Sequence, residues 1–268
     1  MSGARSFIEK WRGLLGVGVA SAVAYRGEFL VWILTTNLPL IMMALWTTVA
    51  AEGPVGRFGQ RGFVAYFLGA LLVRFLSGSW VVWQLTWDIR EGGLGPRLLK
   101  PMHPFAYYAG ENLAQIPLRL LVSVPLVLAL VVGVGPAALG HDYRQWLLLP
   151  VLLLGAWLVL YTAMLVVASL ALFVDSALAV WELWMAVGYV LSGYLMPFEL
   201  LPAPLRRVAW WLPWRVTLAL PLETLLGLCS VRESLAGLAL QLVWVTVFGA
   251  AALALWRRGM RRFAAFGG

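Results

Sequence analysis

The sequence has little cysteine and little charge. Cys229 is its only cysteine, so no disulfide can form within the chain and no thiol cluster is present to hold zinc or an iron–sulfur centre. Charged residues make up 12% of the 268 positions, whereas soluble domains carry roughly 25%. We therefore predict no metal site and no cofactor bound by the chain itself.

Motifs for nucleotide binding and catalysis are also missing. The chain has no GxxxxGK[ST] loop to cradle phosphates, no HExxH metal helix and no GxSxG nucleophile turn. It therefore has no conventional means of binding ATP, and an ATP-driven activity would need a separate subunit. We predict that the chain is not itself an enzyme.

Hydrophobic residues dominate the sequence. They make up 62% of it, and the mean hydropathy is +0.86, which indicates lipid as the solvent. A helix needs about 20 apolar residues to cross the ~30 Å hydrocarbon layer, and six runs are long enough: 29–51, 63–87, 118–139, 146–174, 177–196 and 235–256. Long unbroken runs favour helices over a closed barrel. We predict an all-α membrane protein with six transmembrane helices in a single domain over residues 1–268.

The N-terminal segment, 1–27, is too polar to span a membrane. Its apolar residues recur at helical spacing opposite Lys10 and Arg12, which is typical of an amphipathic helix lying on the membrane surface. The alternative is a signal peptide, because Arg5, Lys10 and Arg12 precede an apolar stretch that ends in Ala22-Val23-Ala24.

Basic residues predict the orientation. The formal charge is +8, but these residues cluster at the ends of apolar runs and form no single stripe, so they indicate membrane topology and not nucleic-acid binding. With the N-terminus in the cytoplasm, twelve basic residues lie inside, seven lie outside and Arg74 falls within a span. We predict a multi-pass protein of the plasma or inner membrane with both termini cytoplasmic. His103 and His141 then lie on opposite sides of the membrane and form no pair.

Two connections are too long to be simple turns. The cytoplasmic segment 88–117 mixes charges, aromatic residues and a Gly92-Gly93-Leu94-Gly95-Pro96 bend that predicts two short helices. The outer segment 197–234 carries five prolines between apolar pieces too short to cross. We predict short re-entrant helices there, covered by protein or by a water-filled cavity.

Charged and aromatic residues inside the spans are candidates for a substrate path. Arg74 lies near the middle of the second span, where a cation usually faces the bundle interior, and Glu182 in the fifth span is a candidate partner. The alternative is that Arg74 contacts backbone carbonyls or reaches towards the interface. Further candidates for a cavity lining are Trp83, Trp181, Trp184 and Tyr189, and for an outer gate Trp210, Trp211 and Trp214. Both aromatic groups could instead be lipid-facing residues or interfacial anchors.

The layout resembles the permease subunits of type-2 ABC exporters (the ABC-2 family). The resemblance is carried by the surface helix and six spans, by IREGGLGPRLLKPMHPFAYYAGENLAQ after the second span, by SGYLMPFELLP after the fifth, and by LWRRGMRRFAAFG at the end. It implies that the segment after the second span docks on a separate P-loop ATPase subunit, which would hold the ATP and Mg²⁺. It also implies that the permease works as a homodimer or as a heterodimer with a related permease.

The implied ATPase-coupling surface lies in 88–111. Its members are charged residues that suit an interface rim and aromatic residues that suit interface anchors: Asp88, Arg90, Glu91, Arg97, Lys100, His103, Phe105, Tyr107, Tyr108 and Glu111. The alternative is a solvated loop whose tyrosines lie among lipid headgroups.

These observations predict an exporter permease that moves an amphiphilic or hydrophobic substrate by ATP-driven alternating access. A secondary transporter is the first alternative, although inverted repeats typical of that class are not visible. An intramembrane enzyme is the second, although the spans lack converging catalytic groups.

Overall fold

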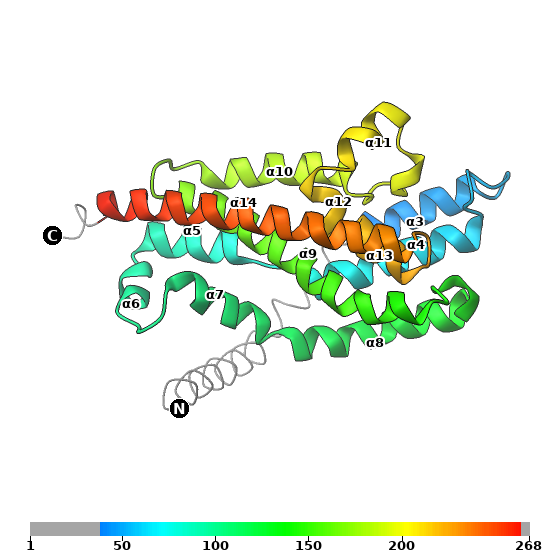
Figure 1. Cartoon of the computed structure of the whole chain (residues 1–268), viewed down its shortest axis with the longest axis horizontal. Helices are drawn as coiled ribbons and strands as arrows, with labels where there is room; N and C mark the ends of the chain where they lie inside the picture. The colour runs from blue at the N-terminus through cyan, green and yellow to red at the C-terminus, as the bar shows by residue number, and fades with distance from the viewer. Residues whose placement is uncertain (1–37, 264–268) are drawn as a thin grey trace.

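The computed structural model describes residues 38–263, and this part of the chain is helical throughout, without a strand (Figure 1). The long helices are α3 (Leu38–Val49), α4 (Gln60–Ser77), α5 (Val81–Glu91), α7 (Pro104–Leu113), α8 (Ile116–Gly133), α9 (Tyr143–Leu170), α10 (Ala177–Leu191) and α14 (Val231–Phe263). The short ones are α6 (Leu94–Leu98), α11 (Ala203–Ala209), α12 (Pro213–Thr217) and α13 (Ala219–Leu225), with 3-10 turns η1 (Pro136–Ala138) and η2 (Phe198–Leu200). The predicted surface helix at 1–27 and the start of the first predicted span lie outside the described residues.

Four helical stretches are long and apolar enough to cross a membrane: Gln60–Glu91, Pro104–Gly133, Tyr143–Leu170 and Val231–Arg262. They correspond to the second, third, fourth and sixth predicted spans. The fifth predicted span contains α10, whose 15 residues cover only about 22 Å at 1.5 Å per residue. Only the part of the first predicted span from Leu38 is described, so the count of six spans stays a prediction.

The second span is not one continuous helix. Gly78 has extended backbone angles (φ −64°, ψ 152°), which end α4, and α5 begins three residues later at Val81. The carbonyl of Gly78 that the break releases accepts a hydrogen bond from the buried guanidinium of Arg119 on α8. A side chain from another helix thus satisfies the backbone at the break, as a low-dielectric environment requires.

Helix α9 is the central element of the bundle. It makes its most extensive contacts with α14 and also packs against α5, α10, α12 and α13. Gln241 of α14 reinforces this packing, because its side-chain amide donates to the carbonyls of Leu152 (3.0 Å) on α9 and Val216 (2.8 Å) on α12. One buried amide therefore joins three helices.

The bundle is elongated, and its two ends carry different connections (Figure 1). The α3–α4 turn, the α8–α9 connection and α11–α13 lie at one end, which we call the outer end. α6, the α9–α10 turn and the C-terminus of α14 lie at the other, which we call the inner end. This grouping agrees with the predicted assignment of connections to two sides of a membrane.

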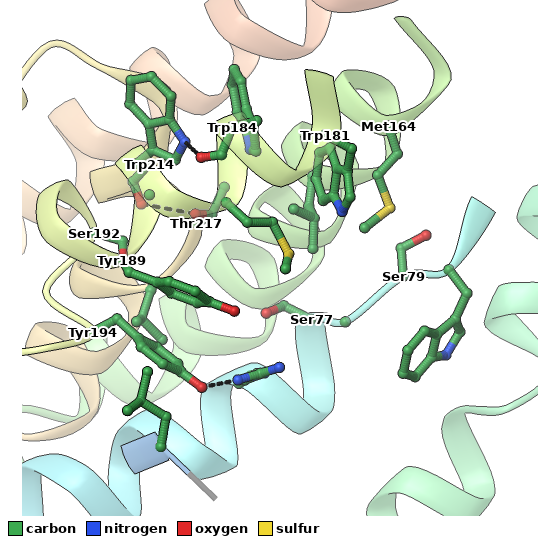
Figure 2. A pocket seen from close by; sticks show the side chains of 18 of the residues that line it. Ser77, Ser79, Met164, Trp181, Trp184, Tyr189, Ser192, Tyr194, Trp214 and Thr217 are labelled. Carbon is green, nitrogen blue, oxygen red and sulfur yellow. Dashed lines mark hydrogen bonds between the residues drawn. The ribbon is translucent and has the colours of Figure 1, made fainter. Parts of the chain in front are cut away.

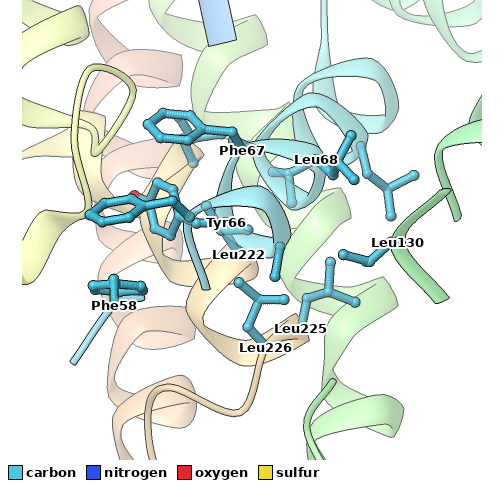
Figure 3. Packing of buried hydrophobic residues seen from close by; sticks show 14 of the residues in the cluster. Phe58, Tyr66, Phe67, Leu68, Leu130, Leu222, Leu225 and Leu226 are labelled. Carbon is cyan, nitrogen blue, oxygen red and sulfur yellow. The ribbon is translucent and has the colours of Figure 1, made fainter. Parts of the chain in front are cut away.

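Two apolar cores stabilise these ends. The outer core joins α4 to α8 and α13, and Figure 3 shows Tyr66, Phe67 and Leu222 packed within it. Gly69 permits this approach, because a Cβ there would lie 2.6 Å from Cδ1 of Leu222. The inner core joins α5 and α7 to α9 and α14 through residues that include Tyr108 and Trp256.

The outer segment folds into η2, α11, α12 and α13, in agreement with the prediction of short helices; how deeply they enter a membrane stays a prediction. A buried ion pair holds this segment together. Arg215 is 2% exposed, donates to Glu223 (2.9 Å) and lies over the ring of Trp210 at 3.6 Å.

Candidate functional site

A pocket of about 450 Å³ lies between α4, α5, α9, α10 and α12, beside the break in the second span (Figure 2). Its lining includes the predicted gate residue Trp214 and five of the six predicted substrate-path residues: Arg74, Trp83, Trp181, Trp184 and Tyr189. The break itself contributes Gly78, Ser79 and Trp80. A volume of this size suits a drug-sized organic molecule.

Tryptophans form one wall of the pocket. The rings of Trp181 and Trp184 are stacked with centroids 6.2 Å apart, and Trp214 continues the wall 4.5 Å from Trp184. Trp214 is fixed by a hydrogen bond from its indole nitrogen to the carbonyl of Trp184 (3.1 Å). Gly188 makes room for it, since a Cβ there would lie 2.7 Å from Cδ1 of Trp214.

Arg74, Tyr189 and Tyr194 form the polar end of the pocket. The guanidinium of Arg74 donates a hydrogen bond to the hydroxyl of Tyr194 and lies 5.2 Å from the centroid of the same ring. Tyr189 stacks on Tyr194 at 5.0 Å, and Figure 2 shows the two hydroxyl groups on the same side of the stack. Tyr194 was missed at the sequence level because it lies in the turn after α10, where only Gly193, with φ +87°, signals a reversal of the chain.

The structure does not bring Glu182 to Arg74. The side chain of Glu182 is exposed on α10 and lies outside the pocket lining, while neighbouring Trp181 turns inwards. The other two predicted gate residues also lie elsewhere: Trp210 covers Arg215, and Trp211 is exposed with its carbonyl accepting from Trp244.

A charged cluster organises the predicted coupling segment. Arg97 of α6 bridges Asp88 of α5 (2.6 Å) and Glu111 of α7 (3.1 Å), and the hydroxyl of Tyr108 donates to Asp88 (2.5 Å). Burial lowers the pKa of Arg97, but Glu111, Tyr108 and Asp88 raise it and the net shift is upward. We call these four residues the coupling cluster, and they fix α6 against α5 and α7. The predicted glycine bend lies between α5 and α6, where Gly92 has a φ of +81°.

Other members of the coupling segment are exposed. Arg90, Glu91 and Lys100 are exposed, and the amine of Lys100 lies 3.7 Å from the ring centroid of Tyr107. Leu99 at the end of α6 is 89% exposed. This surface combines charge with an apolar tip at the inner end of the bundle.

His103 and Phe105 fix the start of α7. His103 caps the helix, because its Nδ1 accepts from the backbone N–H of Phe105 (3.2 Å). The carbonyl of Phe105 accepts from the hydroxyl of Tyr161 on α9 (2.5 Å), and its ring lies 5.0 Å from that of Trp256 on α14. The segment is thus attached to the two most extensively packed helices.

Asn112 connects the coupling segment to the pocket. Its side chain is 1% exposed, accepts from Ser79 Oγ (3.0 Å) and the Trp80 backbone N–H (3.3 Å), and donates to Gln84 (3.3 Å) and to the Tyr108 carbonyl (3.0 Å). Asn112 therefore joins α7 to the broken backbone that lines the pocket. Asn112 was not predicted as a site residue, because a single amide near the end of a polar segment belongs to no recognisable motif.

The described residues thus have the features of a multi-pass helical membrane protein, with four helical stretches long and apolar enough to cross a membrane and a pocket between the helices. Residues 62–267 match the family described as ABC-2 family transporter protein, and the chain belongs to this family. It is a transport permease, as the sequence resemblance indicated. A comparison with curated proteins finds no match.

Proposed function

We propose that this chain is the permease subunit of an ATP-driven exporter that moves an amphiphilic or hydrophobic substrate by alternating access. Separate P-loop ATPase subunits would bind ATP and Mg²⁺, and the permease would act with a second, identical or related permease. The inner end would face the cytoplasm from a plasma or inner membrane. The family supports a transporter permease, and the contacts between coupling segment and pocket support the driven mechanism.

One continuous path of contacts carries the proposal. It starts at the coupling cluster, where Tyr108 contacts Asp88, passes through the Tyr108 carbonyl to Asn112, and ends at Ser79 and Trp80 in the pocket wall. A displacement of α6 and α7 by a partner would therefore shift the break beside the pocket. Broken helices of this kind are where packed bundles can rearrange between two states.

The exposed faces are compatible with this assembly. The apolar windows of the α7–α8 and α14 spans are only 17% and 11% buried, which leaves wide faces for lipid or for a second permease. The exposed tip of α6 with Leu99, Arg90 and Lys100 would contact the ATPase.

Co-purification with a P-loop ATPase tests the proposal. We expect an ATPase whose turnover in nanodiscs depends on the permease, and Asn112→Leu should lower that permease-dependent turnover several-fold while the complex still assembles. The matched control is Thr86→Val, which also replaces a buried polar group near the break but whose hydroxyl makes no hydrogen bond. Transport by the permease alone, driven by an ion gradient, would refute the ATP-driven mechanism and favour a secondary transporter.

A further inference from the structure

Trp181 has a polar group that the described protein does not use. Its side chain is 2% exposed and its indole Nε1–H is buried without a hydrogen-bond partner. Figure 2 shows this nitrogen on the edge of the ring that faces the pocket. A buried donor without an acceptor is destabilising, so the N–H is suited to an acceptor atom brought by a ligand.

The neighbouring side chains can make room for such an acceptor. Met164 and Met185 line the same pocket, and unbranched thioether chains adapt to the shape of a ligand. The tryptophan wall beyond them offers flat apolar surface, which suits a planar or aliphatic body.

The opposite end of the pocket selects for charge. Arg74 is the cationic side chain of the lining, and no carboxylate is among its described residues. The hydroxyl groups of Tyr189 and Tyr194 lie beside it and add donors suited to oxygen atoms. A guanidinium in a low-dielectric environment attracts an anion more strongly than it would in water.

We propose that this pocket binds an amphiphilic organic anion, with its carboxylate, sulfonate or phosphate at Arg74, its apolar body against the Trp181–Trp184–Trp214 wall, and an oxygen atom accepting from the indole N–H of Trp181. The inference deepens the proposed function by naming the class of cargo. A lipid with an anionic headgroup and a free amphiphilic acid share this chemistry.

Energy transfer from tryptophan to pyrene measures binding directly. The purified full-length chain in phosphatidylcholine nanodiscs is titrated with 1-pyrenebutyrate and with its neutral counterpart 1-pyrenebutanol, and the midpoint of the saturable signal gives the affinity. We expect the anion to bind at least about tenfold more tightly, the factor for one charge-assisted hydrogen bond. Equal midpoints for the two probes would overturn the proposal.

Variants assign the effect to the two polar groups. Arg74→Gln should abolish the preference for the anion, and Arg74→Lys should keep part of it. Trp181→Phe, which retains a ring but has no N–H, should leave the midpoint of 1-pyrenebutyrate unchanged, because both oxygen atoms of this probe lie at Arg74. The same variant should weaken by about tenfold the binding of a 1-pyrenebutyrate that also carries a hydroxyl group on its ring. The matched control is Trp157→Phe, since the buried indole N–H of Trp157 is also without a partner but lies outside the pocket lining.

Two further arms complete the test. If Arg74→Gln does not give a monodisperse protein, the comparison of the two probes on the unmodified chain still decides. Repeating the titration in nanodiscs with phosphatidylglycerol distinguishes an anionic lipid from a free amphiphilic acid as the natural ligand. A higher midpoint for 1-pyrenebutyrate, caused by competition from the lipid, assigns the pocket to an anionic lipid. An unchanged midpoint assigns it to a free amphiphile. The assay contains no ATPase, so a failure to bind the anion rejects this cargo class without affecting the evidence for ATP coupling.

Discussion

His103 shows how one side chain can make the coupling segment sensitive to pH. Burial and the nearby Arg257 lower the pKa of His103 below its ordinary value near 6.5. The neutral imidazole accepts the bond from Phe105 that caps α7, and protonation removes this acceptor. Because the pKa is depressed in the folded state, the stabilisation is complete above about pH 6.5 and is lost as the pH falls through the folded-state pKa.

Replacing His103 should therefore remove a pH dependence. We expect the apparent Tm of the purified protein to fall on acidification from about pH 7.5 to about pH 5, and His103→Asn, which can still cap the helix, to show a smaller fall. A helix cap contributes about 1 kcal/mol, so the difference should be a few degrees at most. His141→Asn, at an exposed position that caps no helix, is the control; identical curves for both variants and the parent would contradict this role.

For single residues, the sequence predicted which side chains line the pocket better than it predicted which side chains they contact. Arg74 and the tryptophans of the pocket were found because charge and large rings within apolar runs are conspicuous. Their partners were not, because Tyr194 lies about 120 residues away from Arg74 along the chain and Glu182 looked equally suitable. Which face of α10 turns inwards is decided by packing, and α10 is so uniformly apolar that its sequence does not mark one face.

The break between α4 and α5 is the element whose integrity depends most on a distant side chain. Arg119 is buried on α8 and donates to the carbonyl of Gly78 and, at 3.2 Å, to Gln115. Arg119→Leu would leave the carbonyl without this donor, and we expect a loss of about 1–3 kcal/mol in the free energy of unfolding. Denaturant unfolding in detergent measures it, with Arg90→Leu at an exposed position as the control. Equal stability of the two variants would show that the break needs no such support.

The elements were predicted well where apolar runs end at polar residues, as for α9 and α14. The break was not predicted, because 63–87 reads as one apolar run and the Gly78-Ser79 pair is no stronger a signal than Gly69, which α4 itself tolerates. The coupling segment was correctly read as short helices around a glycine bend. That its charges form an interface rim stays a prediction; not predicted were the contacts of Arg97 with Asp88 and Glu111, which hold the segment together.

Across the whole molecule, the outer end contains two ion pairs of different character. Arg215 and Glu223 are buried, with side-chain exposures of 2% and 13%, while Arg57 and Glu199 are more exposed, at 47% and 32%. Removing one partner of a buried pair costs about 3–5 kcal/mol, whereas an exposed pair contributes at most about 1 kcal/mol. We expect Arg215→Met to destabilise the protein strongly and Arg57→Met only slightly, as read from unfolding midpoints. A similar loss for both would mean that the outer segment is not held by its buried charge.

The packing of α9 against α14 also has a consequence during biosynthesis. α9 is complete at Leu170, about sixty residues before the start of α14, the helix that covers it most extensively. Until α14 is inserted, the backbone of α9 at Leu152 lacks the amide of Gln241, and its largest contact face is open to lipid or to chaperones. A chain whose synthesis stops early would thus present an unfinished central helix, and this is the state that membrane quality-control proteases should recognise.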